Sequence, residues 1–513
     1  MSFPYVFTFY SFKGGVGRSM AMMNVAYWMA GHGRHVLMVD MDLEAPGISS
    51  FLQRNNELAP PASDYQEDLV SLLSLMIDGV RSGMPLPELR ASLPPLSRYL
   101  RSVDPEKLAP LRSKYGELGR LDVLGLDVSA GYSNRIAALN LHLLDREQLV
   151  QLSSLLRAYL KAHRFPFRPT GIEEFEPPDE TSYDYVLVDS RTGITEIGGI
   201  CVGPLADRLV VVTGLNDQNI EGTRHFLEET GIEIRPRAPD DEPWDDAVRF
   251  VGPSLLAQTL GPKPTIIVAS PVPHGDAQLK AERLGALRAK LGVEPRTLSY
   301  HSQVALMERI FVRDFQREHL STEYVDLAST LLGLAEKVLL SEISMNRVLS
   351  YASDTSSEDT LRYRLLDIEV PRISDSRHRR RALSLLSHLP EQRTKALVTW
   401  GYECIALAVS APEPDATRYL RSAADRLQTA SAEDPEGAPN RVSEILLRSA
   451  RRHAVQGNAT EALRYLEALR ADGQLSQAQW ESNLAANAFD PIRETPEFQA
   501  FLNTVRNKEQ RSS

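Results

Sequence analysis

The feature that most constrains the fold is the stretch from Tyr5 to Ile48, YVFTFYSFKGGVGRSMAMMNVAYWMAGHGRHVLMVDMDLEAPGI. Alternating aromatic and aliphatic residues in Tyr5–Tyr10 predict a buried strand, and apolar residues at helical spacing predict a helix over Met20–Ala30. A second buried strand is predicted at His35–Asp40. A glycine-rich turn separates the first strand from the helix, so the stretch predicts a strand, phosphate loop, helix and strand unit.

The glycine-rich turn favours the binding of a polyphosphate. Glycines allow backbone N–H groups to turn inward without a clash at Cβ, and they face the positive end of the following helix. The hydroxyl of Ser19, which begins that helix, is placed to ligate Mg²⁺. A purely structural turn is the alternative, which the Val-Asp-Met-Asp run after the helix disfavours. The predicted nucleotide-binding residues are Lys13, Gly14, Gly15, Val16, Gly17, Arg18, Ser19 and Met20.

These residues resemble the deviant Walker A motif, KGGxGK[ST], of the MinD/ParA group of P-loop ATPases. The resemblance implies ATP and Mg²⁺ as cofactors, and a homodimer around the nucleotide in which Lys13 reaches the phosphates bound by the partner. Arg18 stands where the usual phosphate-loop lysine would be. A guanidinium is permanently charged and can bind two phosphate oxygens, but it is bulkier than an ammonium group. Nucleotide binding is therefore expected, whereas the rate of hydrolysis is left open.

Two carboxylates, Asp40 and Asp42, come at the end of the second predicted strand. They are expected at the carboxyl edge of a parallel sheet, where α/β proteins bind ligands, and a solvated strand end is the alternative. By the resemblance, Asp42 would orient the attacking water, and Asp40 would lie near Mg²⁺. Placing water in line and neutralising charge is most of the work of phosphoryl transfer. The predicted catalytic residues are thus Lys13, Arg18 and Asp42.

A further buried strand ending in a carboxylate is predicted at Tyr183–Asp189. Asp189 fits the Walker B element that holds a Mg²⁺-bound water, so the predicted metal site consists of Ser19, Asp40 and Asp189. The residues from Asp189 onward resemble the family's switch II, commonly DSPAGI. The predicted switch II is Asp189, Ser190, Arg191, Thr192 and Gly193. Arg191 stands where the family has a proline. Its alternative roles are to sense the nucleotide, to pair with an acid of a second subunit, or to form a salt bridge on the surface.

The chain has 513 residues, which is too long for a single hydrophobic core. Predicted strands separated by helical segments indicate an α/β fold for residues 1–342, with a doubly wound, mostly parallel sheet. A stretch rich in Leu, Pro, Ser and Arg, at about residues 49–119, predicts a helical insertion in this domain. The insertion is either a lid, a partner-binding surface or a spacer.

The C-terminal part of the chain has a different pattern. A polar linker is predicted at residues 343–360, and residues 361–513 lack buried strand patterns, which indicates an all-α domain. Paired helices are expected there, one pair being Arg441–Gln456 with Thr460–Ala471. The small and large residues of this pair are spaced similarly to those of a tetratricopeptide repeat, and an unrelated helical bundle is the alternative. Either arrangement presents a groove, so binding of a protein partner is predicted.

One basic cluster stands out: Arg377, His378, Arg379, Arg380 and Arg381. ParA-type ATPases bind DNA through basic patches, so the four arginines are candidates for contacts with DNA phosphates. The alternative is a solvated helix face, which is the usual meaning of such a charge run. The net charge of −11 argues against a general nucleic-acid coat.

Composition also bears on the cellular location of the protein and on the kinds of site that it can contain. Cys201 and Cys404 are the only cysteines, far apart and without metal-ligand spacing, so neither a disulfide scaffold nor a zinc site is expected. Neither a signal peptide nor a membrane span is predicted, and no stable membrane anchor is expected. These features predict a cytoplasmic location.

Three functions are compatible with these features of the sequence. The first is a Mg-ATP-hydrolysing switch that dimerises around nucleotide and signals to protein partners through its helical domain, in a bacterial conflict, defence or partitioning system. The second is a nucleotide-binding scaffold with little or no hydrolysis, because Arg18 has replaced lysine. The third is a ParA-like protein that positions itself on DNA without sequence preference.

Overall fold

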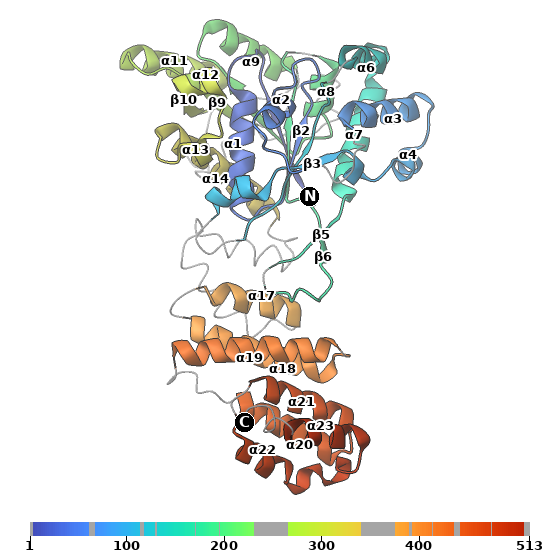
Figure 1. Cartoon of the computed structure of the whole chain (residues 1–513). Helices are drawn as coiled ribbons and strands as arrows, with labels where there is room; N and C mark the ends of the chain where they lie inside the picture. The colour runs from blue at the N-terminus through green and yellow to red at the C-terminus, as the bar shows by residue number, and fades with distance from the viewer. Residues whose placement is uncertain are drawn as a thin grey trace. The chain divides into compact units, whose positions relative to one another are not determined.

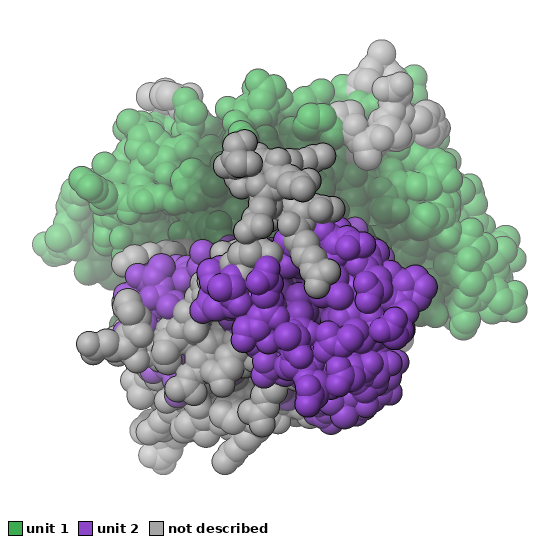
Figure 2. All heavy atoms as spheres, turned by 60° about the horizontal axis from the view of Figure 1, so that its bottom comes forward, with its two compact units in different colours: residues 1–167, 180–350 green, residues 168–179, 351–513 purple. Residues whose placement is uncertain are grey.

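A computed structural model describes residues 4–60, 67–112, 117–128, 131–169, 171–193, 195–229, 265–339, 375–388, 392–412, 414–434, 442–472 and 475–506. The chain divides into two compact units (Figure 2). The first comprises Met1–Phe167 with Glu180–Ser350, and the second comprises Arg168–Asp179 with Tyr351–Ser513. The predicted linker at residues 343–360 lies outside the described residues.

The first unit is built on one eight-stranded sheet with the order β10-β9-β8-β1-β7-β2-β4-β3 (Figure 1). Neighbouring strands run parallel, except for the antiparallel pair of β3 and β4 at one edge. The strands are β1 (Tyr5–Tyr10), β2 (Val36–Asp40), β3 (Leu100–Ser102), β4 (Leu121–Leu124), β7 (Tyr185–Asp189), β8 (Arg208–Thr213), β9 (Thr265–Val272) and β10 (Arg296–Ser299). The predicted doubly wound, mostly parallel α/β fold is confirmed.

Helices cover both faces of this sheet (Figure 1). The helices described in the unit are α1 (Arg18–Gly31), α2 (Gly47–Arg54), α3 (Leu69–Arg81), α4 (Leu86–Ser92), α5 (Pro105–Leu108), α6 (Tyr132–Leu139), α7 (Arg146–Ala162), α8 (Glu196–Val202), α9 (Asp217–Glu229), α11 (Ala277–Leu291), α12 (Ser302–Met307), α13 (Phe311–Asp314) and α14 (His319–Leu339). Because successive strand side chains point to opposite faces, Phe7 packs with α1, α13 and α14, whereas Val6 packs with α3, α7 and α8. Burial on both faces explains why the central strands are continuous apolar runs.

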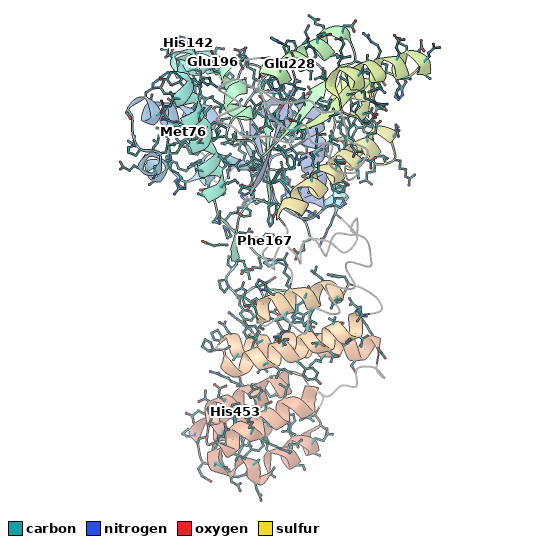
Figure 3. The ribbon with its side chains drawn as sticks, turned by 180° about the vertical axis from the view of Figure 1, so that it is seen from behind. Met76, His142, Phe167, Glu196, Glu228 and His453 are labelled. Atoms are coloured by element: carbon teal, nitrogen blue, oxygen red, sulfur yellow. The ribbon has the colours of Figure 1, made fainter. Side chains whose placement is uncertain are left out.

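In its described residues, the predicted insertion contains helices and one short strand. Helix α3 begins after Asp68, whose side chain accepts a hydrogen bond from the backbone N–H of Ser71. Met76 of α3 lies in the apolar cluster that also includes residues of α7 (Figure 3). The chain then returns to the sheet as the edge strand β3, which the sequence did not predict. The insertion is therefore packed onto the core of the first unit.

The second unit is helical in the residues described. Its helices are α17 (Ser376–Leu386), α18 (Arg393–Ser410), α19 (Asp415–Glu433), α20 (Val442–Val455), α21 (Ala459–Asp472), α22 (Gln477–Leu484) and α23 (Pro496–Arg506). Helix α18 packs against α19, and α20 packs against α21. The rings of His453 and Tyr465 stack between α20 and α21, with centroids 5.5 Å apart; Figure 3 labels His453. The helical region agrees with the sequence, while its likeness to tetratricopeptide repeats stays a prediction.

The second unit also contains a segment from the middle of the first. The chain leaves the α/β unit after Phe167 and returns at Glu180, and residues 168–179 belong to the helical unit. The short strands β5 (Phe165–Phe167) and β6 (Asp179–Thr181), at the two ends of residues 168–179, pair with each other. Phe167 is labelled in Figure 3. Among the residues described, no helix is both long and apolar enough to cross a membrane.

Candidate functional site

The glycine-rich loop lies between the carboxyl end of β1 and the start of α1. Gly15 and Gly17 have φ values of +78° and +81°, in the left-handed region that favours glycine. Gly17 directly precedes α1, and neither a side-chain cap nor an acidic residue in the first turn satisfies the start of that helix. The backbone therefore presents N–H groups and the positive helix end to the same place, as an anion site requires.

Strand register brings two buried carboxylates beside this loop. In the β2–β7 ladder Asp40 lies opposite Asp189, and both side chains have no solvent exposure. Strand β1 pairs with the other side of β7, with Phe9 opposite Asp189. The loop that follows β1 therefore lies next to the acidic ends of β7 and β2, as the sequence predicts for a parallel sheet.

Arg18 connects the loop to the carboxylates. Its Nε donates to Asp189 Oδ1 at 2.5 Å, and its Nη2 donates to Asp42 Oδ2 at 2.8 Å. Its side chain is only 5 % exposed. Burial by itself lowers the pKa of Arg18, but the ion pairs with Asp189 and Asp42 raise it above its ordinary value. The guanidinium is therefore the counter-ion of two acids.

Ser19 and Ser49 hold the two buried carboxylates in place. The Ser19 hydroxyl donates to Asp189 Oδ2 at 2.5 Å. The backbone N–H and the hydroxyl of Ser49, in α2, donate to Asp40 Oδ2 at 2.9 and 2.7 Å. Sequence analysis missed Ser49, although its position in the first turn of a helix after the Asp40–Asp42 pair was a usable signal.

The remaining oxygen of Asp40 fits a cation site. Asp40 Oδ1 is buried and has no hydrogen-bond partner among the described residues. Burial, together with the charge of Asp189, raises the pKa of Asp40 to about 7. A divalent cation near Asp40, Asp189 and the Ser19 hydroxyl would compensate this charge. Among the described residues, no group of three or more His, Cys, Asp or Glu side chains is arranged so that it could hold a metal ion.

Replacement of Asp40 by asparagine tests this charge balance. Because folding raises the pKa of Asp40 from 3.8 to about 7, its ionisation opposes folding increasingly as the pH rises between these values. In EDTA and without nucleotide, Asp40→Asn should therefore raise the melting temperature by several degrees at pH 8, a gain of about 1–3 kcal/mol. The gain should shrink toward pH 5, in thermal unfolding followed by circular dichroism. A variant that is less stable than wild type at pH 8 would contradict the assigned environment.

The other predicted residues lie around the loop. Lys13 is half-buried, and its side chain has no hydrogen bond or ion pair among the described residues. Arg191 of the predicted switch II forms a partly exposed ion pair of 2.5 Å with Glu44. Ser190 is buried, and Gly193 has a φ of +77°. The structure thus brings the loop, Asp40, Asp42 and the residues from Asp189 together.

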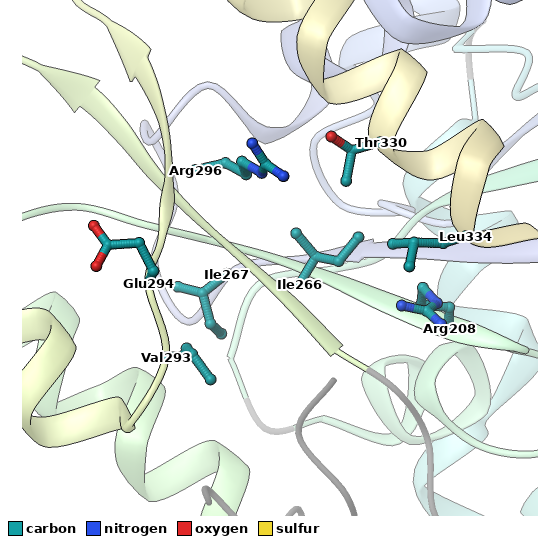
Figure 4. A pocket seen from close by; sticks show the side chains of 8 residues that line it. All are labelled: Arg208, Ile266, Ile267, Val293, Glu294, Arg296, Thr330 and Leu334. Carbon is teal, nitrogen blue, oxygen red and sulfur yellow. The ribbon is translucent and has the colours of Figure 1, made fainter. Parts of the chain in front are cut away.

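A separate pocket lies elsewhere in the first unit (Figure 4). Arg208, the first residue of β8, and Ile266, near the start of β9, both line it. Thr330 and Leu334 of α14 contribute the facing side. The pocket is therefore near the amino ends of strands, whereas the candidate nucleotide site is at their carboxyl ends.

The predicted basic cluster is not a solvated face. Arg380 and Arg381 are only 1 % and 2 % exposed. Arg377 pairs with Asp179 at 2.9 Å, and Arg379 pairs with Glu403 at 2.5 Å. Three of the arginines pair with acids elsewhere in the chain, and burial removes Arg380 and Arg381 from solvent. This geometry does not favour a DNA contact through the cluster.

The fold and the loop define a P-loop nucleotide-binding protein, and sequence comparison names the family. A family model described as the CobQ/CobB/MinD/ParA nucleotide binding domain matches residues 7–464, so the chain belongs to this family. No curated protein sequence gives a significant match.

Solved structures with a similar fold include ParA and MinD proteins. A ParA family ATPase from Chlorobium tepidum has 15% sequence identity and a TM-score of 0.36, with 64% of this chain and 99% of the other covered. The cell division ATPase MinD of Pyrococcus furiosus has 14% identity and a TM-score of 0.38, with the same coverage. MinD of Pyrococcus horikoshii, complexed with Mg-ADP, has 12% identity and a TM-score of 0.37, with 64% and 97% covered.

Proposed function

We propose that the chain binds Mg-ATP at residues 13–20 and hydrolyses it slowly, as a nucleotide-dependent switch. The observation that carries the proposal is the meeting of four elements at one edge of the sheet. These are the glycine loop with its uncapped helix, the Ser19 hydroxyl, the buried pair of Asp40 and Asp189, and Asp42. Such a set provides anion binding, cation binding and a carboxylate for orienting water.

Each residue of this site then has a defined role. The loop amides and Arg18 bind phosphate oxygens, while Ser19, Asp40 and Asp189 hold Mg²⁺, directly or through its waters. Mg²⁺, when bound, supplies neutralisation of the charge on the transferred phosphoryl group. Asp42, whose side chain is 14 % exposed, can reach a water at the open side of the site. Arg18 pairs with both Asp42 and Asp189, so a phosphate oxygen bound by its guanidinium would replace one of these carboxylates.

The proposal includes a homodimer formed on ATP binding. Lys13 supports it, because this half-buried cation has no partner among the described residues and stands where the family has its signature lysine. The helical unit would then bind a protein partner, in a conflict, defence or partitioning system. A scaffold without hydrolysis is the second candidate, and the observation that favours it is the double ion pair of Arg18.

Two measurements on one preparation separate these functions. Purified protein with Mg-ATP should release phosphate above the level of Lys13→Ala, and its mass in solution should double with a non-hydrolysable ATP analogue. Lys13→Ala should remain monomeric with the analogue, while Lys107→Ala, at a half-buried lysine of the insertion, serves as the matched control. Binding without turnover in wild type would favour the scaffold, and a monomer in both states would eliminate the dimer.

A further inference from the structure

Residues 168–179 contact the helical unit mainly through charged and aromatic side chains. The segment, RPTGIEEFEPPD, contains Glu173, Phe175 and Glu176, an aromatic residue between two acids. It is separated from α17, α18 and α19 by about 200 residues of chain, yet it belongs to the same compact unit. Its side-chain contacts with these helices include ion pairs, hydrogen bonds and an aromatic contact.

Glu176 is the centre of these contacts. It accepts hydrogen bonds from Nη1 and Nη2 of Arg380, both at 2.8 Å, and from the Tyr419 hydroxyl at 2.5 Å. The carboxylate is 8 % exposed, and the arginine side chain is 1 % exposed. Burial alone would raise the pKa of Glu176, but the hydrogen bonds from Arg380 and Tyr419 lower it to about 2. A bidentate guanidinium–carboxylate pair of this kind is geometrically selective.

Glu173 makes a second set of polar contacts, with α19. Its Oε1 pairs with Nη2 of Arg426 at 2.8 Å, and its Oε2 accepts a hydrogen bond from the Ser422 hydroxyl at 2.8 Å. The Cys404 thiol lies 3.9 Å from Oε1. The helical unit therefore offers separate hydrogen-bond donors to two carboxylates that are three positions apart.

Phe175 and Gly171 complete the fit. The ring of Phe175 meets the ring of Tyr419 edge-on, with centroids 5.0 Å apart, and Arg418 lies over it at 5.3 Å. Gly171 has a φ of +85°, and a Cβ there would lie 2.8 Å from the backbone oxygen of Arg380. The segment thus approaches the α17 backbone at a point where only glycine fits.

We propose that α17, α18 and α19 form a binding site for an acidic peptide with an aromatic residue between two carboxylates, and that residues 168–179 occupy it as an intramolecular ligand. Two buried or half-buried cations and two hydroxyl donors match the two acids, while an aromatic and a cationic contact match the phenylalanine. The segment masks the site, and it is followed in the chain by β6 and then by β7, which ends at Asp189. The proposal concerns the helical unit and does not depend on nucleotide binding.

The test removes the internal ligand and supplies it in trans. Full-length Glu173→Gln/Glu176→Gln protein should bind a fluorescent peptide of residues 168–179, measured by anisotropy. Wild type should bind it at least about 10-fold more weakly, because a tethered segment competes at an effective concentration near the millimolar range. The same peptide with glutamine in place of Glu173 and Glu176 should not bind. The matched control variant is Glu174→Gln, since this exposed residue of the segment should leave the site masked.

Hydrogen exchange on the same variants gives an independent readout. In the double variant the amides of residues 171–176 should exchange faster, while those of α18 and α19 keep their protection. Equal peptide binding by wild type and the double variant, or no binding by either, would overturn the proposal. Loss of helical circular dichroism, or joint exchange of the segment and the helices, would also overturn it, because the segment would then be part of the folding core.

Discussion

Replacement of Arg18 by alanine is expected to lower the melting temperature of the nucleotide-free protein by roughly 5–10 °C. The reason is that Arg18 is the cation that faces both Asp189 and Asp42, and its side chain is 5 % exposed. Removal of one partner of a buried ion pair leaves an uncompensated charge, which typically costs about 3–5 kcal/mol. Thermal unfolding in EDTA, followed by circular dichroism, measures the effect.

Two further variants separate the buried ion pairs from a general loss of charge. Arg18→Lys keeps the charge but cannot bind both acids with a planar fork, so it should recover part of the loss. Arg191→Ala removes another arginine at the same edge, whose pair with Glu44 is partly exposed and should contribute below about 1 kcal/mol. An Arg18→Ala protein as stable as wild type would show that the guanidinium is not the counter-ion of these acids. Added Mg²⁺ should stabilise Arg18→Ala more than wild type, because it would replace the missing cation.

Replacement of Asp42 by asparagine is expected to lower the rate of phosphate release about 100-fold or more while changing ATP affinity only a few-fold. The side chain has nearly the same size, but it loses the charge that orients water and accepts its proton. The binding groups, which are the loop amides, Ser19 and the buried pair of Asp40 and Asp189, are unchanged. Single-turnover phosphate release and ATP titration of the same variant make the comparison.

The matched control for Asp42 is Glu44→Gln. Glu44 lies two positions further along the chain, is 58 % exposed and pairs with Arg191. Its replacement should leave phosphate release within about two-fold of wild type, since an exposed ion pair contributes little. Equal losses in both variants would assign the effect to the loop as a whole, and no loss in Asp42→Asn would remove Asp42 from the reaction.

The α/β fold was predictable because its signals are local. Apolar runs that end in Asp40 and Asp189 indicate buried strands, and the glycines after Tyr10 indicate a loop before a helix. Parallel strands bring their carboxyl ends to one edge, so the meeting of the loop with both acids followed from the order of elements. In the structure, the register of β2 and β7 places Asp40 opposite Asp189, which agrees with that expectation.

The contacts that the sequence did not reveal join residues far apart in the chain. Arg18 was predicted as a phosphate ligand, but its partner Asp189 is 171 positions away and no local pattern indicates the pair. Arg380 belonged to a charge run that ordinarily indicates a solvated face, and its partner Glu176 is 204 positions away. Both arginines are buried because long-range acids compensate their charge, which periodicity and composition do not encode.

The central claim is that residues 13–20 bind the phosphates of a purine nucleotide with Mg²⁺. The most direct measurement is calorimetric titration of the full chain with ATP, with Mg²⁺ present and with EDTA. We expect saturable binding with one nucleotide per chain, weakened in EDTA and weakened further by Gly17→Val, because a β-branched residue is strained at a φ of +81°. An absence of saturable binding of any purine triphosphate by the folded wild-type protein would contradict it.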